Sequence, residues 1–370
     1  MPTDKKKTPS HGGASLLALG CIGILLALPA VRTHLAADPL YYIIPNALMF
    51  TPFRELTRAA WGMLLHDVDK SVKRDPVHIP VIAANDYSFE SLRSATDNFR
   101  HPAVVRGLFN GVPAMEKWKD KNYMNSKLGH FSVPVVRRAL YGTLQNDRGV
   151  MPFREANTDI MTNPDSKMYL FFPVQSRTNF NGSDHGQGED LKQAVNDLVQ
   201  QDLELSTRIW NGFSTDKHKN YFGAQLIIGR GSNDTDATTG TGWHCAVGNN
   251  WFAQIVGKKR WYFMDPVHSA LLSPLRGGKA NMQTSNPNMA DLHPHIPMQY
   301  ADISAGDLLY NPDWEWHTIK NYDGLSIGCP IREINLTLSM QNNMQYTMIV
   351  LANQLADKLG FDIGGYAPSQ

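Results

Sequence analysis

The chain has 370 residues, of which 42% are hydrophobic and 19% charged, so it can bury a substantial core. Its formal net charge is +1 and its only dense basic run is Lys5-Lys6-Lys7, which argues against a nucleic-acid partner. Three cysteines, Cys21, Cys245 and Cys329, are too few for a disulfide scaffold. We therefore expect one large globular domain with extensions.

An uncharged apolar stretch covers residues 14–31, after a short basic tail over residues 1–13. It is just long enough to cross a bilayer, and the preceding lysines predict that the N-terminal end stays in the cytosol. The alternative is a cleaved signal peptide with a processing site near 35–37. We favour a single-pass membrane anchor, because the apolar run exceeds the usual core of a signal peptide. Both interpretations place the rest of the chain in the endomembrane system or an organelle lumen.

Residues 32–78 are interpreted as a connector. The segment 40–53 is apolar but broken by prolines, and it is too short for a second span. The connector either lies on a membrane surface or packs on the following domain as a helical extension. That domain is predicted over residues 79–343, and residues 344–370 are predicted to form a C-terminal helix with apolar residues on one stripe.

The first half of the domain mixes helical patterns with a strand. Helices are predicted over 88–99, over 112–118 with Pro113 in the first turn, and over 186–211, and a strand is predicted over 101–107. After Tyr221, short runs rich in β-branched and aromatic residues alternate with turn signals. These runs predict strands over 224–228, 251–256, 260–264, 307–310 and 334–339, with turns at 229–231, 257–259 and 323–324. Several short strands with this spacing are typical of a sandwich or barrel.

Two segments of the strand-rich part each carry one histidine. His244 follows Thr241-Gly-Trp, and His317 follows a Gly-Asp-Leu-Leu-Tyr-Asn-Pro string and a tryptophan-rich turn. A single histidine beside a tryptophan is usually a packed core residue. Two of them on strands of one small barrel can converge on a metal, because neutral imidazole binds iron, nickel, copper and zinc. The pair therefore favours a metal site made by the fold.

These two strings resemble those of the JmjC and cupin-like oxygenases that depend on Fe(II) and 2-oxoglutarate. The likeness extends back to the strand at 101–107 and to Trp118, and covers roughly residues 79–340. It implies a mostly β fold, the double-stranded β-helix or jelly roll, with flanking helices. It also implies that His244 and His317 bind Fe(II) and that 2-oxoglutarate is the cosubstrate.

The resemblance also assigns residues to the cosubstrate. Lys259 matches the lysine that pairs with the far carboxylate of 2-oxoglutarate, while Thr241, Asn250 and Asn335 match polar residues that line its site. Independently of the family, a cationic side chain on a strand beside a metal can neutralise a buried dicarboxylate. The alternative for Lys259 is an exposed lysine in a turn.

Ala246 departs from the family pattern, because it stands where His-x-Asp or His-x-Glu supplies a carboxylate ligand. Its methyl group cannot coordinate a metal, and three interpretations follow. Chloride binds there, as in the radical halogenases of this class, which resemble the chain in having alanine or glycine at the position. A substitute ligand comes from Asp184, Asp313 or Glu315. Or the protein is a non-catalytic, cupin-like binding protein.

The sequence thus predicts an enzyme, an Fe(II)/2-oxoglutarate-dependent oxidoreductase acting on an aliphatic C–H bond. Ala246 is the position expected to decide between halogenation and hydroxylation, with chloride as a third ligand besides iron and 2-oxoglutarate. The expected anchor favours a lipid or another small molecule delivered from the membrane as substrate. The sequence does not indicate which substrate, which membrane or which oligomeric state.

Overall fold

The computed structural model describes residues 71–139, 148–173, 189–210, 221–232, 238–272, 274–276, 281–284, 292–322 and 324–358. The predicted tail and anchor, and the connector up to residue 70, lie outside these ranges. Within them, no helix combines the length and the apolar character needed to cross a membrane. The anchor therefore stays a prediction.

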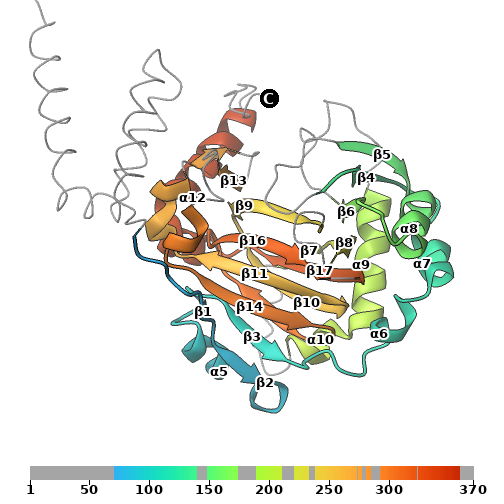
Figure 1. The fold of residues 1–370 in the computed structure, drawn as a ribbon, viewed down its shortest axis with the longest axis horizontal. Helices are drawn as coiled ribbons and strands as arrows, with labels where there is room; N and C mark the ends of the chain where they lie inside the picture. Colours follow the sequence, from blue (N-terminus) through green and yellow to red (C-terminus); the bar gives the residue numbers. More distant parts are fainter. Residues whose placement is uncertain are drawn as a thin grey trace, which may run out of the picture. The chain divides into compact units, whose positions relative to one another are not determined.

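The described part of the chain contains two sheets, which enclose the space between them (Figure 1). One has seven strands in the order β1-β14-β11-β16-β9-β13-β12, and the other has ten, β2-β3-β15-β10-β17-β8-β6-β4-β5 with β7 beside β17. Eight central strands form the frame: β8 (Leu226–Gly231), β9 (Gly240–Ala246), β10 (Asn249–Val256), β11 (Lys258–Met264), β14 (Gln299–Ser304), β15 (Leu308–Asn311), β16 (Trp316–Asn321) and β17 (Gly324–Glu333). If these eight strands are numbered one to eight in chain order, β14-β11-β16-β9 of the first sheet have the order 5-4-7-2. The strands β15-β10-β17-β8 of the second sheet have the order 6-3-8-1. This order is that of a jelly roll, which confirms the mostly β, jelly-roll part of the predicted fold.

Shorter strands extend both sheets: β1 (Val77–His78), β2 (Val81–Ala83), β3 (Ala103–Arg106), β4 (Ser132–Val136), β5 (Arg148–Pro152), β6 (Tyr169–Phe172), β7 (Tyr221–Ala224), β12 (Pro274–Arg276) and β13 (Asn281–Thr284). The predicted strand over 101–107 corresponds to β3. Most of the others escape a periodicity argument because they are short, polar or contain proline. β1 pairs with β14, so the sheet includes two residues of the predicted connector.

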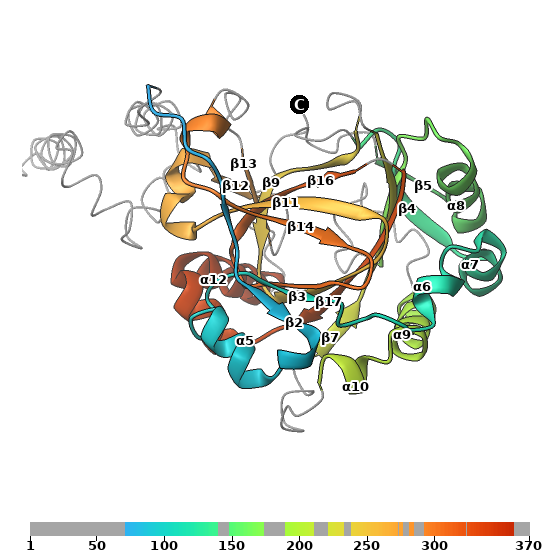
Figure 2. The same ribbon diagram turned by 60° about the horizontal axis from the view of Figure 1, so that its bottom comes forward.

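Helices pack on the outer side of the ten-stranded sheet through a shared apolar cluster, and Figure 2 shows them beside the sheet. They are α5 (Phe89–Ala95), α6 (Ala114–Lys117), α7 (Lys121–Leu128), α8 (Phe153–Thr162), α9 (Glu189–Leu203) and α10 (Leu205–Arg208). Short 3-10 helices occur at Ala84–Asp86, Pro266–Leu272 and His293–His295. Helix α6 begins after Pro113 as predicted, and α9 with α10 occupies the helical stretch predicted over 186–211.

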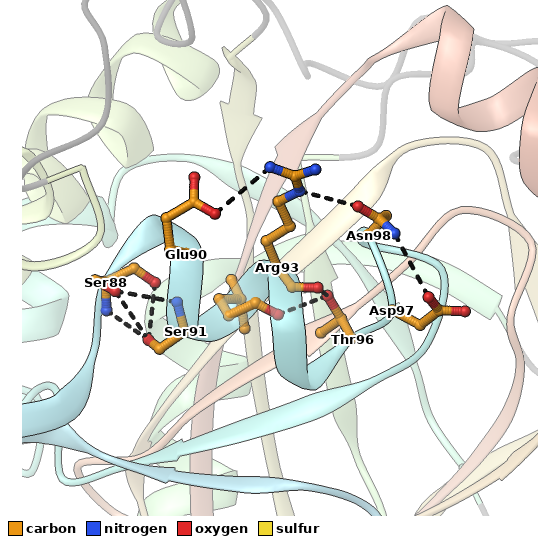
Figure 3. Close-up of polar contacts among 8 residues, drawn as sticks. Ser88, Glu90, Ser91, Arg93, Thr96, Asp97 and Asn98 are labelled. Carbon is orange, nitrogen blue, oxygen red and sulfur yellow. Dashed lines mark hydrogen bonds and ion pairs between the residues drawn. The ribbon is translucent and has the colours of Figure 1, made fainter.

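Helix α5 is shorter than the predicted helix over 88–99. Ser88 caps its first turn: the Ser88 hydroxyl accepts from the Ser91 N–H, and the Ser91 hydroxyl accepts from the Ser88 N–H (Figure 3). The helix ends because residues 97–99 adopt left-handed backbone angles, with φ of 46°, 60° and 66°. Residues 97–99 therefore turn the chain toward β3.

The predicted strand over 334–339 is wrong, because helix α12 (Leu336–Lys358) begins there. Asn335 precedes the helix, and its Oδ1 accepts from the Leu338 N–H at 3.2 Å. Such side-chain capping favours a helix start over continuation of the strand. In α12, Met348 and Leu355 of the predicted apolar stripe are exposed, whereas Tyr346 and Val350 are buried.

Alternation along β10 defines the interior. Trp251 and Ala253 join the apolar cluster beneath the helices, whereas Phe252 packs between the sheets against Trp261. Even-numbered residues of β10 therefore face the space between the sheets. The predicted turn at 229–231 is wrong, because these residues continue β8. Gly229 lies close to an interior side chain: a Cβ at this position would lie 2.6 Å from the ring of Tyr169.

Candidate functional site

Two histidines face each other inside the jelly roll. His244 of β9 and His317 of β16 are directly opposed in neighbouring antiparallel strands, with ring centroids 4.2 Å apart. Their Nδ1 atoms lie 2.8 Å from the backbone carbonyl oxygens of Gly242 and Glu315, respectively. When Nδ1–H donates to these carbonyls, the Nε2 lone pair of each ring is left for a metal. The indole of Trp261 stacks on His317 at 5.2 Å and fixes its plane.

Both imidazoles are held in the neutral form that binds metals. Burial lowers the pKa of His244 to about 4, and the positive charge of Arg332 acts in the same direction. Burial, the neighbouring His244 and Arg332 hold the pKa of His317 well below its usual range. Two neutral, adjacent imidazoles are a donor set that suits Fe(II).

Ala246 lies two residues beyond His244 on the same strand and therefore on the same face. Its carbonyl accepts from the Trp314 N–H at 3.0 Å, which ties this end of β9 to the turn before β16. Among the described residues, no group of three or more His, Cys, Asp or Glu side chains is placed to hold a metal. The described residues here thus offer two candidate metal ligands, His244 and His317.

The described candidates for a substitute ligand are Asp313 and Glu315. The Asp313 carboxylate accepts from the Gly248 N–H and from the Ser339 hydroxyl, and burial raises its pKa to about 7. Burial, with Asp265 nearby, holds the pKa of Glu315 well above its usual range, and both of its carboxyl oxygens are buried without a hydrogen-bond partner among the described residues. Neither completes the histidine pair, and Asp184 lies outside the described residues.

Lys259 of β11 is fully buried, so the alternative of an exposed turn lysine is wrong. Its Nζ donates to Asn321 Oδ1 at 2.5 Å and lies 5.6 Å from the ring centroid of Tyr169. No carboxylate in the described part of the chain pairs with it, and burial lowers its pKa to about 7. The Tyr169 hydroxyl is also buried, without a hydrogen-bond partner among the described residues. A lone buried cation in such surroundings fits an incoming carboxylate.

The pKa of Lys259 leads to a prediction about proton uptake. The ligand-free lysine is mostly neutral above pH 7, whereas a bound carboxylate favours the charged form. Binding of 2-oxoglutarate at pH 8 should therefore take up most of one proton, and affinity should fall as pH rises above 7. Below pH 6 the lysine is already charged, so uptake should vanish. Calorimetry in buffers of different ionisation enthalpy measures this, and equal uptake at both pH values would contradict it.

Thr241 reaches the interior through a β-bulge. His317 opposes His244, but Ile319 opposes Thr241, so β9 contains one extra residue at this point. The shift places Thr241 on the inner face with Ile319, and the Thr241 hydroxyl accepts from the Ile319 N–H at 3.2 Å. Thr241 therefore lies between the histidine pair and the Lys259–Asn321 pair, as expected of a residue lining the cosubstrate site.

Asn250 of β10 also faces the interior. It stands directly between Asn311 of β15 and Arg332 of β17 in the register of the ten-stranded sheet. The Asn250 Oδ1 atom is buried and has no hydrogen-bond partner in the described part of the chain. Asn311 Nδ2 lies 3.4 Å from His317 Nδ1, so this row of side chains borders the histidine pair.

Asn335 does not join this group, because it caps α12 beyond the last strand. The interior instead contains Tyr169 and Arg332, which sequence reasoning missed. Tyr169 begins a run of β-formers, Tyr169–Phe172, that could have been read as a strand. Arg332 lies two residues after Pro330 and therefore on the same face of β17. Because the predicted strand began only at residue 334, this inward position was not predicted.

The comparisons with known proteins agree with this geometry. Residues 93–332, more than half of the chain, match the family described as the cupin-like domain. The match includes both histidine strands, Lys259 and Arg332, and ends before Asn335. The comparison with curated proteins gives no match. The chain therefore belongs to the family of proteins with a cupin-like domain.

Proposed function

We propose that the protein is a non-haem Fe(II)/2-oxoglutarate-dependent oxidoreductase acting on an aliphatic C–H bond. One observation carries the proposal: the neutral pair His244–His317 shares its interior with the fully buried Lys259, which has no acidic partner among the described residues. A metal site alone would not need this lysine. A metal site joined to a buried cation fits a cosubstrate that chelates iron at one end and ends in a carboxylate at the other.

In this proposal each residue has a defined role. His244 and His317 hold the metal through Nε2, and Lys259 with Asn321 holds the far carboxylate. Iron with bound 2-oxoglutarate supplies the oxidising power to remove a hydrogen atom from an aliphatic carbon. The apolar side chains between the sheets, Phe252 and Trp261 among them, exclude water from the site.

We further propose that Ala246 makes room for a halide, so that the product carries chlorine when chloride is bound. The supporting observations are that Asp313 binds Gly248 and Ser339, and that no group of three or more His, Cys, Asp or Glu side chains among the described residues is placed to hold a metal. The same enzyme without a bound halide would be a hydroxylase. The anchor proposed at residues 14–31 makes a lipid or other membrane-delivered small molecule the favoured substrate.

Ala246→Asp tests the halide proposal. Anaerobic protein carrying Fe(II) and 2-oxoglutarate should change its visible absorption when chloride or bromide is added. The Ala246→Asp variant should lose this response, because its carboxylate occupies the position and repels anions. Ala246→Gly is the matched control and should keep it. An equal response in Ala246→Asp would remove the halide proposal and leave the iron and 2-oxoglutarate roles intact.

The broader proposal is tested by iron binding and by succinate formation. Wild-type protein should bind about one Fe(II) per chain, with two histidine ligands, and should convert 2-oxoglutarate to succinate under oxygen. Protein that binds neither iron nor 2-oxoglutarate would instead be a non-catalytic cupin-like binding protein.

A further inference from the structure

The turn over residues 312–315 directly precedes His317 and contains a backbone conformation that its sequence does not favour. Trp314 has a φ of 64°, in the left-handed region, which a bulky side chain rarely adopts. Its side chain is nevertheless fully buried. Such a conformation persists only where the surrounding structure imposes it, and it often marks a functional position. The contacts of Trp314 therefore show what holds this turn in place.

The backbone of the turn fixes both sides of the histidine site. The Trp314 N–H donates to the Ala246 carbonyl at 3.0 Å, which holds the end of β9. The next carbonyl, that of Glu315, lies 2.8 Å from Nδ1 of His317 and orients that ring. Because these two contacts come from neighbouring peptide units, a tilt of the turn would move His317 and Ala246 relative to each other.

The C-terminal helix α12 holds the indole of Trp314. Trp314 Nε1 donates to the Thr347 hydroxyl at 2.9 Å, and both side chains are buried. The Thr347 hydroxyl lies 2.8 Å from the carbonyl oxygens of Ser339 and Asn343, to one of which it donates. The ring of Tyr346 packs edge-on against the indole at 5.3 Å. The indole therefore has one fixed orientation, set by the helix.

Two segments of α12 take part in this contact. A ψ of 91° at Asn343 breaks the helix, and Asn343 Oδ1 caps the second segment by accepting from the N–H three residues later. Thr347 stands in the first turn of that second segment. In the first segment, the Ser339 hydroxyl donates to Asp313 Oδ1 at 2.7 Å. The two segments thus hold consecutive residues of the turn, Asp313 and Trp314.

We propose that Thr347 and Trp314 are positioning residues of the histidine site: Thr347 holds the indole, and the turn that contains Trp314 fixes how His317 and Ala246 lie relative to each other. The inference rests on the proposed binding of a metal by the histidine pair. Partners that orient metal ligands change metal affinity by about 10- to 100-fold when they are removed. Loss of the Thr347 hydroxyl should therefore change the metal site itself as well as the stability of the fold.

The experiment titrates full-length protein with Co(II), whose visible absorption depends on its ligands and their arrangement. Thr347→Val keeps the shape of the side chain but leaves the indole N–H without an acceptor. It should weaken Co(II) binding by about 10- to 100-fold and change the spectrum. Thr347→Ser restores the hydroxyl and should return both toward the wild type. Trp314→Phe removes the N–H donor and should reproduce Thr347→Val, and the two effects should not add in the double variant, because both remove the same bond.

Ser166→Ala separates this effect from a general loss of stability. The Ser166 hydroxyl is buried in the loop before β6, where it accepts from the Met168 N–H at 3.3 Å and donates to the Asp159 carboxylate. Its removal should lower the temperature of thermal unfolding and leave Co(II) affinity and spectrum unchanged. His244→Ala should abolish the Co(II) spectrum, which assigns that spectrum to the histidine site.

Unchanged Co(II) affinity and spectrum in folded Thr347→Val and Trp314→Phe would overturn the positioning role while the proposed metal site stands. If one of the two variants fails to fold, the other decides. An equal change in Ser166→Ala would assign the effect to stability alone and would also overturn the role. If wild-type protein gives no Co(II) spectrum that depends on His244, the proposed metal site fails, and the positioning role fails with it.

Discussion

Replacing His244 or His317 with alanine should lower Fe(II) affinity by more than about a hundredfold. Loss of a residue that merely orients a metal ligand already costs 10- to 100-fold, and these two histidines are the ligands themselves. Because no third His, Cys, Asp or Glu completes the site among the described residues, little remains to hold the metal. Anaerobic competition with a coloured chelator measures the affinity.

Two further variants make this result specific. His244→Gln and His317→Gln keep most of the side-chain volume of the adjacent histidine pair, so they separate metal loss from a packing defect. His78→Ala removes an exposed histidine of β1 and should bind iron as the wild type does. Wild-type affinity in both alanine variants would show that His244 and His317 only pack against each other.

The central strands and the histidine pair were accessible from the sequence. Runs such as 251–256 and 260–264 are rich in β-branched and aromatic residues, which favour strands. They lie within the observed strands β10 and β11. Both histidines follow distinctive sequence motifs that resemble those of the oxygenase family, so the two side chains could be expected to lie close together. Short strands such as β13, Asn-Met-Gln-Thr, have polar sequences and become strands because β9 and β12 offer them partners.

Other features depend on register, which the sequence does not contain. Lys259 follows a glycine turn and looks exposed, but the pairing of β11 with β16 turns it inward against Asn321. At the end of β17, Arg332 faces inward, while Asn335 already caps the next helix. A shift of one residue moves a side chain to the other face of a strand. The sequence position alone therefore could not show whether Arg332 or Asn335 faces the interior.

The fate of the missing carboxylate also needed the structure. The sequence identifies Ala246 as a lost ligand and names Asp313 and Glu315 as substitutes by proximity to His317. Proximity along the chain did not reveal that Asp313 binds Gly248 and Ser339, or that burial raises the pKa of Glu315 well above its usual range. Where a turn directs its carboxylates depends on tertiary packing, and the two histidines remain the proposed protein ligands among the described residues.

Lys259→Met should weaken 2-oxoglutarate binding by at least about thirtyfold, because truncating one partner of a buried charge pair costs about 2–5 kcal/mol. Methionine keeps the length of the aliphatic chain in the fully buried position and removes only the charge. Metal affinity should stay within about twofold, because the lysine does not contact the histidines and loses no metal ligand. Calorimetric titration of Mn(II)-loaded protein without oxygen gives both constants.

Lys258 is the matched control for this variant. It precedes Lys259 on the same strand but is exposed, so Lys258→Met removes the same charge from the solvent side and should leave 2-oxoglutarate affinity unchanged. The variant Lys259→Met should also stop the proton uptake expected at pH 8, since that proton is assigned to the Lys259 amine. Equal loss of affinity in both lysine variants would point to a general effect of net charge. Unchanged affinity in Lys259→Met would mean that the buried lysine is a structural partner of Asn321 and that the far carboxylate is held elsewhere.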